Sequence, residues 1–384
     1  MVSTHLRIAT VTAAILSAAF GMSRTEPEPA PVQVGRVRPI AAMSAARAAH
    51  TATALLNGAV LIVGGFAGSE NQLAGAEILE PGAERFTKTG QPLFPRQSHS
   101  ATRLADGNVL IAGGLTSEGR YTNCAELYDP ATRAFRQAGE MTVARAGHGA
   151  VLLDDGRVLV IGGVGKGWTF LASAEIYDPR TERFTSTGSM GEPRESHIAV
   201  RLRDGRVLVA GGHRGRGAAT AISRTAEIFD PAKGGFGASS AMAIRRHKHD
   251  AITLPDGRVF VFGGSDERDN EGVYSGVEVF DPKTSRFSVG APMRTGRYKH
   301  RGTTLLLSGG GVLLAGGATQ AEEYNPTSGE SRIVEGEARL AGQFSTATTL
   351  QDGRVLITGG YGGGQGPRSA AWIFEPRDSR PTGR

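Results

Sequence analysis

The stretch that decides the fold is DGRVLVIGG, residues 155–163, followed by AEIYDPRTERF, residues 174–184. Its first part is an apolar run that ends on two glycines, and the chain of 384 residues carries seven such runs. They are VLIVGG at 60–65, VLIAGG at 109–114, VLVIGG at 158–163, VLVAGG at 207–212, VFVFGG at 259–264, VLLAGG at 312–317 and VLITGG at 355–360. A period of about 50 residues indicates a fold built from one supersecondary unit per copy.

Each copy contains four short strands. In the third copy the first two strands, residues 148–153 and 158–161, are joined by Asp155–Gly156, a hairpin turn in which both residues tolerate positive φ. The second strand is apolar throughout, so we expect both of its faces to be buried. Residues 174–179 form the third strand and 183–188 the fourth. Such units predict an all-β, seven-bladed β-propeller of four-stranded blades, in which each sheet buries its apolar face against the next.

The ring is expected to close through the N-terminal segment. The last copy stops at AWIFEP, residues 371–376, with no outer strand after it. The spacing between each outer strand and the next copy places residues 34–40 where that strand is missing. A strand from this segment completes blade 7 and removes the free sheet edges. The paired glycines are expected where backbone approaches closely and positive φ is needed.

These features together resemble a Kelch repeat of the bacterial type. The diglycine, the hairpin turn and the outer-strand aromatic recur at fixed offsets over nearly all of the chain after its first 33 residues. The resemblance implies a seven-bladed propeller, but it does not imply one function. Kelch propellers include protein-binding scaffolds, sugar mutarotases and copper oxidases of the galactose oxidase family.

The N-terminus predicts export. A short basic segment precedes an apolar run from Ile8 to Phe20, and small residues follow it. We therefore assign residues 1–21 to a signal peptide, 22–33 to a Pro-rich tether, 34–378 to the propeller and 379–384 to a tail. The expected location is secreted or periplasmic, with no membrane span after cleavage. The single cysteine, Cys124, excludes an intrachain disulfide.

A mildly basic net charge of +6 carries no nucleic-acid signature, because acidic residues are spread through the same repeats and no long Lys/Arg run occurs. We expect a monomer that does not bind nucleic acid.

An Arg-x-x-His motif precedes each first strand in six copies, and a glutamate stands in the third strand of the same copies. In the seventh copy all three positions change together, to Gly342, Ser345 and Trp372. This joint loss favours a structural network over a ligand or metal site, because a buried arginine needs a carboxylate partner. The predicted network contains Arg47, His50, Glu77, Arg96, His99, Glu126, Arg145, His148, Glu175, Arg194, His197, Glu227, Arg246, His249, Glu278, Arg297, His300 and Glu322.

The copper chemistry of the galactose oxidase relatives is not expected here. In that family, copper-binding tyrosines stand immediately before the histidine position, and one is cross-linked to a cysteine. No tyrosine occupies that position, which holds Ala49, Ser98, Gly147, Ser196, Lys248, Lys299 and Phe344. Tyr298 is one residue too early, so its side chain is expected on the opposite face of the strand. We predict no metal, no cofactor and no catalytic residue.

A ligand is expected on the face that carries the starts of the first strands and the loops between second and third strands, called the loop face below. The loop of blade 6 is short and leaves a predicted notch, and basic residues concentrate in blades 4–6. The alternative is a solvated rim balanced by Asp266, Glu267 and Asp269. The candidate ligand-binding residues are Trp168, His213, Arg214, Arg216, Arg245, Lys248, Lys299 and Arg301.

Two functions remain open. The first is an exported binding scaffold that engages a protein, a peptide or an anionic glycan through the loop face. The second is a carbohydrate-active enzyme, mutarotase-like or oxidase-like. A deep pocket holding a carboxylate with a histidine in hydrogen-bond reach favours the enzyme, whereas a shallow basic surface favours the scaffold.

Overall fold

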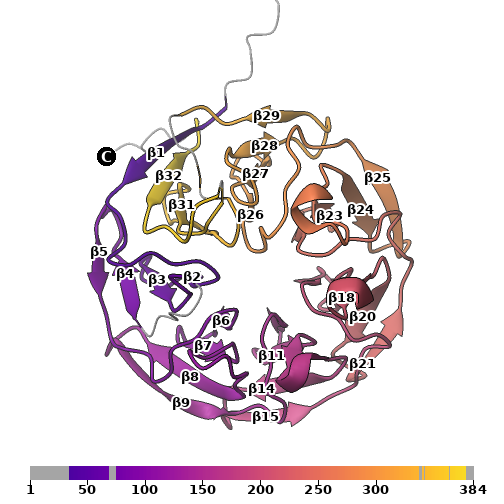
Figure 1. Ribbon diagram of the computed structural model, residues 1–384, viewed down its shortest axis with the longest axis horizontal. Coiled ribbons are helices and arrows are strands. Elements are labelled where there is room, and N and C mark those ends of the chain that lie inside the picture. The colour runs from indigo at the N-terminus through magenta and orange to yellow at the C-terminus, as the bar shows by residue number, and fades with distance from the viewer. Residues whose placement is uncertain (1–33, 69–74, 337–339, 341, 363, 378–384) are drawn as a thin grey trace, which may run out of the picture. The chain divides into compact units, whose positions relative to one another are not determined.

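The computed structural model describes residues 34–68, 75–336, 340, 342–362 and 364–377. The segments assigned to the signal peptide and the tether lie outside these residues, as do residues 378–384. The described chain contains seven four-stranded antiparallel sheets arranged in a ring (Figure 1). No described helix is long and apolar enough to cross a membrane.

The blades follow the seven copies in order. Blade 1 consists of β2 Thr51–Ala54, β3 Val60–Val63, β4 Ala76–Leu79 and β5 Phe86–Lys88. Blade 2 consists of β6 Ser100–Arg103, β7 Val109–Ala112, β8 Cys124–Asp129 and β9 Ala134–Glu140. Blade 3 consists of β10 Gly149–Leu152, β11 Val158–Ile161, β14 Ala174–Asp178 and β15 Arg183–Ser186. Blade 4 consists of β16 Ile198–Arg201, β17 Val207–Ala210, β20 Ala226–Asp230 and β21 Gly235–Ala238. Blade 5 consists of β22 Asp250–Thr253, β23 Val259–Phe262, β24 Val277–Asp281 and β25 Arg286–Gly290. Blade 6 consists of β26 Thr304–Leu306, β27 Val312–Leu314, β28 Glu322–Tyr324 and β29 Ser331–Ile333. Blade 7 consists of β30 Thr346–Thr349, β31 Val355–Thr358, β32 Ala371–Glu375 and β1 Arg36–Ile40.

The first strand of the chain closes the ring, as predicted. β1 pairs antiparallel with β32, with Val37 opposite Phe374 (Figure 1). The Val37 N–H also donates to the Glu335 carbonyl of blade 6 at 2.9 Å, so the closing strand contacts two blades. Blade 7 therefore combines residues from both ends of the propeller.

The hydrophobic core is divided into seven clusters, and each lies between two neighbouring blades. Every residue of the second strands is buried, from Val60–Val63 in blade 1 to Val355–Thr358 in blade 7. This confirms that both faces of these strands pack against protein. One blade alone would leave both apolar faces in water, so the ring is the stable unit.

The paired glycines are required by close backbone contacts. A Cβ at Gly162 would lie 2.7 Å from the Arg194 carbonyl oxygen of the next blade, and φ at Gly162 is +62°. Gly163 has φ of +92°, and a Cβ there would lie 2.6 Å from the Ala146 carbonyl oxygen. Residues with a Cβ are excluded here both by space and by backbone conformation.

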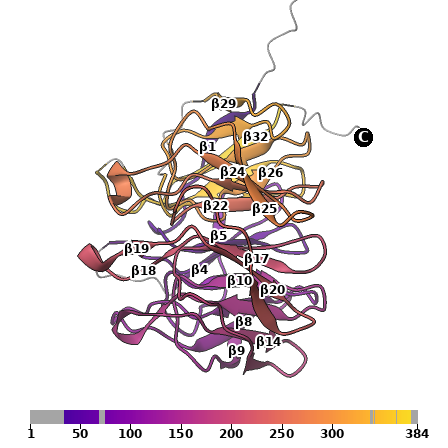
Figure 2. The ribbon, with the colours of Figure 1, turned by 90° about the vertical axis from the view of Figure 1, so that its right-hand side faces the viewer.

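Two small hairpins and a short helical turn extend the loop face. Blade 3 carries β12 Val164–Gly165 and β13 Thr169–Phe170, joined by the 3-10 turn η1 Lys166–Trp168. Blade 4 carries β18 His213–Arg214 and β19 Ala221–Ile222, joined through η2 Gly217–Ala219, and these strands project from one face of the ring (Figure 2). Blade 5 carries η3 Asp269–Glu271.

Candidate functional site

A cavity of about 350 Å³ lies on the axis of the ring at the loop face, and we call it the axial cavity. All seven blades line it with the residue that precedes the histidine position. These residues have left-handed backbone, with φ between +52° and +63°. They are Ala49, Ser98, Gly147, Ser196, Lys248, Lys299 and Phe344. Six of the seven are not glycine, which is uncommon for this conformation and is found where the surrounding structure enforces it.

Backbone hydrogen bonds join these seven residues into a ring. Each N–H donates to the carbonyl of the same position in the preceding blade, as from Ser98 to Ala49 at 3.1 Å and from Phe344 to Lys299 at 2.8 Å. Among the described residues six of the seven links are present, and the missing one would join the Ser196 N–H to the Gly147 carbonyl. The sevenfold pattern is therefore interrupted at one place, between blades 3 and 4.

The Glu195 side chain lies at this interruption. A Cβ at Gly147 would stand 2.4 Å from Glu195 Oε1, so the glycine makes room for the carboxylate. Glu195 lines the axial cavity, and its Oε2 lies 3.3 Å from His213 Nδ1. His213 Nδ1 is in turn 3.2 Å from His247 Nδ1. Burial lowers the pKa of His213 although the charge of Glu195 opposes this shift. In the neutral ring, Nδ1 can donate one proton toward either Glu195 or His247, but not toward both.

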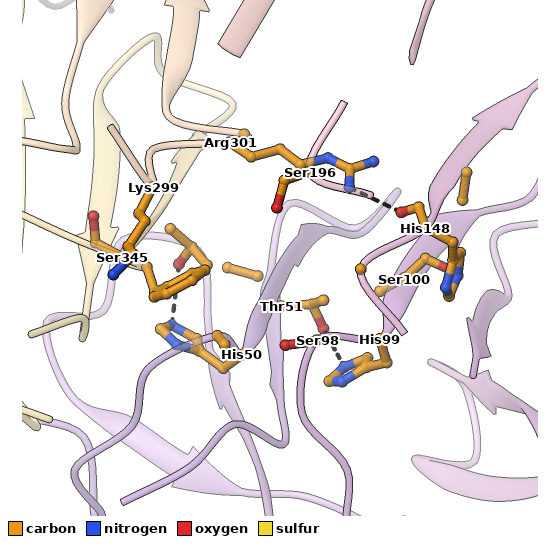
Figure 3. A pocket seen from close by; sticks show the side chains of 18 of the residues that line it. His50, Thr51, Ser98, His99, Ser100, His148, Ser196, Lys299, Arg301 and Ser345 are labelled. Atoms are coloured by element: carbon orange, nitrogen blue, oxygen red, sulfur yellow. Dashed lines mark hydrogen bonds between the residues drawn. The ribbon is translucent and has the colours of Figure 1, made fainter. Parts of the chain in front are cut away.

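Arg301 crosses the cavity from the opposite side of the ring. It belongs to blade 6, and its Nη1 donates to the His148 carbonyl of blade 3 at 2.8 Å (Figure 3). The side chain is exposed to the cavity, and no carboxylate among the described residues lies within ion-pair distance of it. The protein that surrounds the cavity desolvates Arg301 and lowers its pKa, and the charges of Asp250 and Glu195 oppose this shift. An arginine starts from so high a pKa that it stays protonated.

The two cavity lysines are held by protein partners. Lys248 Nζ lies 2.6 Å from Asp269 Oδ1 of η3. Lys299 Nζ lies 3.1 Å from the Tyr361 hydroxyl and 3.8 Å from Asp269 Oδ2. It also lies 5.0 to 5.6 Å from the ring centres of Tyr298, Phe344 and Tyr361, a cation–π arrangement. Of the three cations that line the cavity, Arg301 therefore has the most N–H donors without a partner among the described residues.

Of the eight residues predicted to bind a ligand, four lie in or beside the axial cavity and four lie outside its lining. Lys248, Lys299 and Arg301 line the axial cavity, and His213 contacts it through Glu195. The other four lie outside the cavity lining: Arg245 pairs with Glu267 at 2.7 Å, Arg216 stacks on Trp168, and Arg214 is exposed on β18.

Acidic residues balance only part of the basic region of blades 4–6, because Arg214, Arg216 and Arg301 form no ion pair among the described residues. Asp269 and Glu267 pair with its cations, as the alternative interpretation had it, and Asp266 pairs with Arg268 at 2.6 Å. The predicted notch at residues 318–320 is not part of the cavity.

The repeated Arg–His–Glu set divides into two parts. Each arginine forms a buried ion pair with the glutamate of its own blade, at 2.5 to 3.0 Å between the closest nitrogen and oxygen. The pairs are Arg47–Glu77, Arg96–Glu126, Arg145–Glu175, Arg194–Glu227, Arg246–Glu278 and Arg297–Glu322.

The histidines do not join these pairs, in contrast to the predicted three-residue network. Instead, four of them contact the preceding blade through Nε2. His50 contacts Thr358, His99 contacts Thr51, His148 contacts Ser100 and His300 contacts the Phe262 carbonyl, at 2.9 to 3.1 Å. His249 has no hydrogen-bond partner on either ring nitrogen among the described residues, and His197 contacts only the backbone of Arg194. Burial lowers the pKa of His50 to about 3 and that of His300 to about 3, so these imidazoles are neutral.

The residues present do not fit the copper centre of galactose oxidase relatives. The seven positions that would supply a tyrosine ligand hold none, and Tyr298 is buried outside the cavity lining. Within the described part of the chain, no group of three His, Cys, Asp or Glu side chains is placed to hold a metal ion. We therefore assign no step to copper.

The fold and the repeats define a seven-bladed propeller built from Kelch motifs. The family model described as Kelch motif matches residues 98–142, 144–191 and 251–294. Among solved structures, a fungal alcohol oxidase of the AA5 family in complex with copper is similar over 90% of this chain and 77% of its own, with a TM-score of 0.70 and 16% sequence identity. At this identity the likeness shows the fold alone. No curated protein sequence matches the chain.

Sequence reasoning missed Glu195, Ser196 and Tyr361 as site residues. The signal for Ser196 was available, because the position before the histidine lines the cavity in every blade. Lys248 and Lys299 at this position were predicted because of their charge, whereas a serine carries no such signal. Glu195 stands one residue further from the histidine, and its place in the cavity depends on the missing side chain of Gly147 in the neighbouring blade.

Proposed function

We propose that the protein is an exported, non-enzymatic propeller that binds the acidic end of a glycan in the axial cavity. The observation that carries the proposal is the position of Arg301, which crosses the cavity and forms one hydrogen bond to the part of the protein that the structure describes. Guanidinium groups with unused donors in a confined site favour carboxylate, sulfate or phosphate. The export part of the proposal comes from residues 1–21.

The groups around Arg301 favour a sugar acid over other anions. Eight hydroxyl side chains line the cavity and can exchange hydrogen bonds with a polyhydroxylated ligand. They are Thr51, Thr53, Ser98, Ser100, Thr102, Ser196, Ser345 and Thr346. The Glu195 carboxylate can accept hydrogen bonds from sugar hydroxyls, and the Ser196 N–H at the interrupted ring is a further donor. The volume of about 350 Å³ is at the small end for ligand pockets, which suits one sugar residue.

The test is isothermal titration calorimetry of the full chain with D-glucuronate and D-galacturonate, and with D-glucose as the neutral control. Arg301→Gln is expected to weaken uronate binding roughly 10- to 100-fold, the loss for one or two charge-assisted hydrogen bonds. Arg245→Gln is the matched control, because Arg245 pairs with Glu267 outside the cavity. Equal affinity for glucose and glucuronate, or an unchanged affinity in Arg301→Gln, would refute the proposal.

Glu195 and His213 support a second candidate, a sugar mutarotase. Mutarotation needs one group to take the proton of the anomeric hydroxyl while another gives a proton to the ring oxygen, and a carboxylate near an imidazole supplies both. Glu195 lines the cavity and His213 Nδ1 lies 3.3 Å from its Oε2, outside the cavity lining, so this function requires the His213 ring to turn toward the sugar. The test is anomer exchange of glucuronate followed by NMR. If wild type and Glu195→Gln show the same uncatalysed rate, the second candidate is excluded and the binding function stands.

A further inference from the structure

Trp168 occupies a position that the fold alone does not explain. It is the last residue of η1 at the tip of the blade 3 hairpin, and 47% of it is exposed. Its φ is +62°, and the preceding Gly167 also has positive φ, at +66°. Glycine or asparagine is the ordinary choice for such a backbone position, and a bulky residue there is a true outlier. Exposed aromatic area and an unfavourable backbone together indicate a role in binding.

Two side chains from neighbouring blades frame the Trp168 ring. Arg216 of blade 4 stacks over it, with the guanidinium carbon 3.5 Å from the ring centre. Tyr121 of blade 2 approaches edge-on, with centroids 6.0 Å apart and an interplanar angle of 86°. Arg216 is exposed and forms no ion pair among the described residues. We call Tyr121, Trp168 and Arg216 the rim platform.

A chain of side-chain contacts links the rim platform to the wall of the axial cavity. Phe170, on the same hairpin as Trp168, contacts the His213 ring at a centroid distance of 5.4 Å. His213 contacts Glu195, which lines the cavity. Burial and the charge of Glu195 raise the pKa of Tyr121, while the charge of Arg216 opposes this shift.

We propose that the rim platform binds the second residue of an acidic oligosaccharide whose terminal residue lies in the axial cavity. This inference rests on the proposed function. An aromatic ring offers a stacking surface to the apolar face of a sugar, and Arg216 keeps donors for a carboxylate while it stacks. Among the described residues neither Arg301 nor Arg216 forms an ion pair, so a ligand with an acid on successive residues complements both.

The test compares galacturonate with di- and trigalacturonate by calorimetry, using the full chain. In the parent protein the disaccharide is expected to bind at least tenfold more tightly than the monosaccharide. Trp168→Ala and Arg216→Gln are expected to reduce disaccharide affinity to the monosaccharide level and to leave monosaccharide affinity unchanged, which also shows that each variant is folded. Phe94→Ala, an exposed aromatic outside the platform, is the control and should change neither affinity.

The outcomes separate this inference from the proposed function. If the parent binds both sugars equally, or if Trp168→Ala weakens both by the same factor, the rim platform is refuted while the cavity proposal stands. If neither sugar binds, both proposals fail. Binding of an oligoglutamate peptide with the same Trp168 dependence, in the absence of oligogalacturonate binding, would overturn the inference in favour of a protein ligand.

Discussion

Replacing Glu175 by alanine should destabilise the propeller far more than removing an exposed carboxylate. Glu175 Oε1 lies 2.8 Å from Arg145 Nη2, and both side chains are almost fully buried. The same carboxylate accepts the N–H groups of Thr142 at 2.7 Å and Val143 at 3.2 Å. Alanine therefore leaves a buried guanidinium and two backbone donors without this acceptor.

The expected loss is about 3–5 kcal/mol, the range for breaking a buried ion pair by removing one partner. Arg145 keeps its contacts to the carbonyls of Gly162 at 2.9 Å and Ser173 at 3.0 Å, so the loss should not exceed this range. For a propeller of about 340 residues the unfolding entropy scales to roughly 0.7 kcal/mol per degree, so the Tm should fall by roughly 4–7 °C.

The assay is thermal unfolding followed by circular dichroism, with guanidinium unfolding as a second measure. Asp154→Ala is the matched control in the same blade, because Asp154 pairs with Arg201 on the surface, where such pairs contribute about 0–1 kcal/mol. A Tm for Glu175→Ala within one degree of the Asp154→Ala value would refute the view that the repeated pairs stabilise the fold.

Three further outcomes follow from the structure. Val37→Asp places a charge in the buried interface of the closing strand and should lower the free energy of unfolding by about 3 kcal/mol. The expected result is a lower Tm and faster proteolysis, whereas an unchanged proteolysis rate would count against closure through β1. Burial, assisted by Arg47, Lys248 and Arg297 respectively, lowers the pKa of His50, His247 and His300 to about 3. Below about pH 6.5 these histidines therefore take up protons in the unfolded chain but not in the folded one. The free energy of unfolding should fall by about 1.4 kcal/mol per pH unit for each of the three histidines as the pH drops toward 3. A constant Tm between pH 7 and pH 5 would contradict this. Calorimetry with Cu²⁺ should show no stoichiometric site and no radical absorption band, because the seven positions before the histidines lack tyrosine; either signal would overturn that conclusion.

The fold could be predicted from the sequence because each copy specifies its own blade locally. The Asp155–Gly156 turn, the apolar residues 158–161 and Gly162 each constrain the backbone within a few residues, and sevenfold repetition leaves one closed arrangement. The missing outer strand after residues 371–376 was enough to place residues 34–40 beside them.

The axial cavity was harder to predict because it depends on contacts across the ring. No pattern near Arg301 indicates that its side chain meets the carbonyl of His148, three blades away. The sequence offered Asp269 as an acid that balances the basic rim, but it did not show that this aspartate pairs with Lys248, which removes that lysine from the candidate cations. The histidines were placed in one network with the arginines because the three residues vary together, whereas they serve two separate contacts in the same blades.

Closure by β1 also sets the order in which the protein can be completed. Arg38 and Glu375 meet in the closing pair although 337 residues separate them in the chain. Because β1 precedes all other strands in the chain, it has no strand to pair with until β32 has been synthesised. Blades 1 to 6 contain only earlier residues and can therefore form before blade 7 is complete. A contact between such distant segments is slow to form and leaves a sheet edge exposed in the meantime. A chain truncated before residue 371 would therefore lack the partner of β1, and its unpaired sheet edge would promote aggregation.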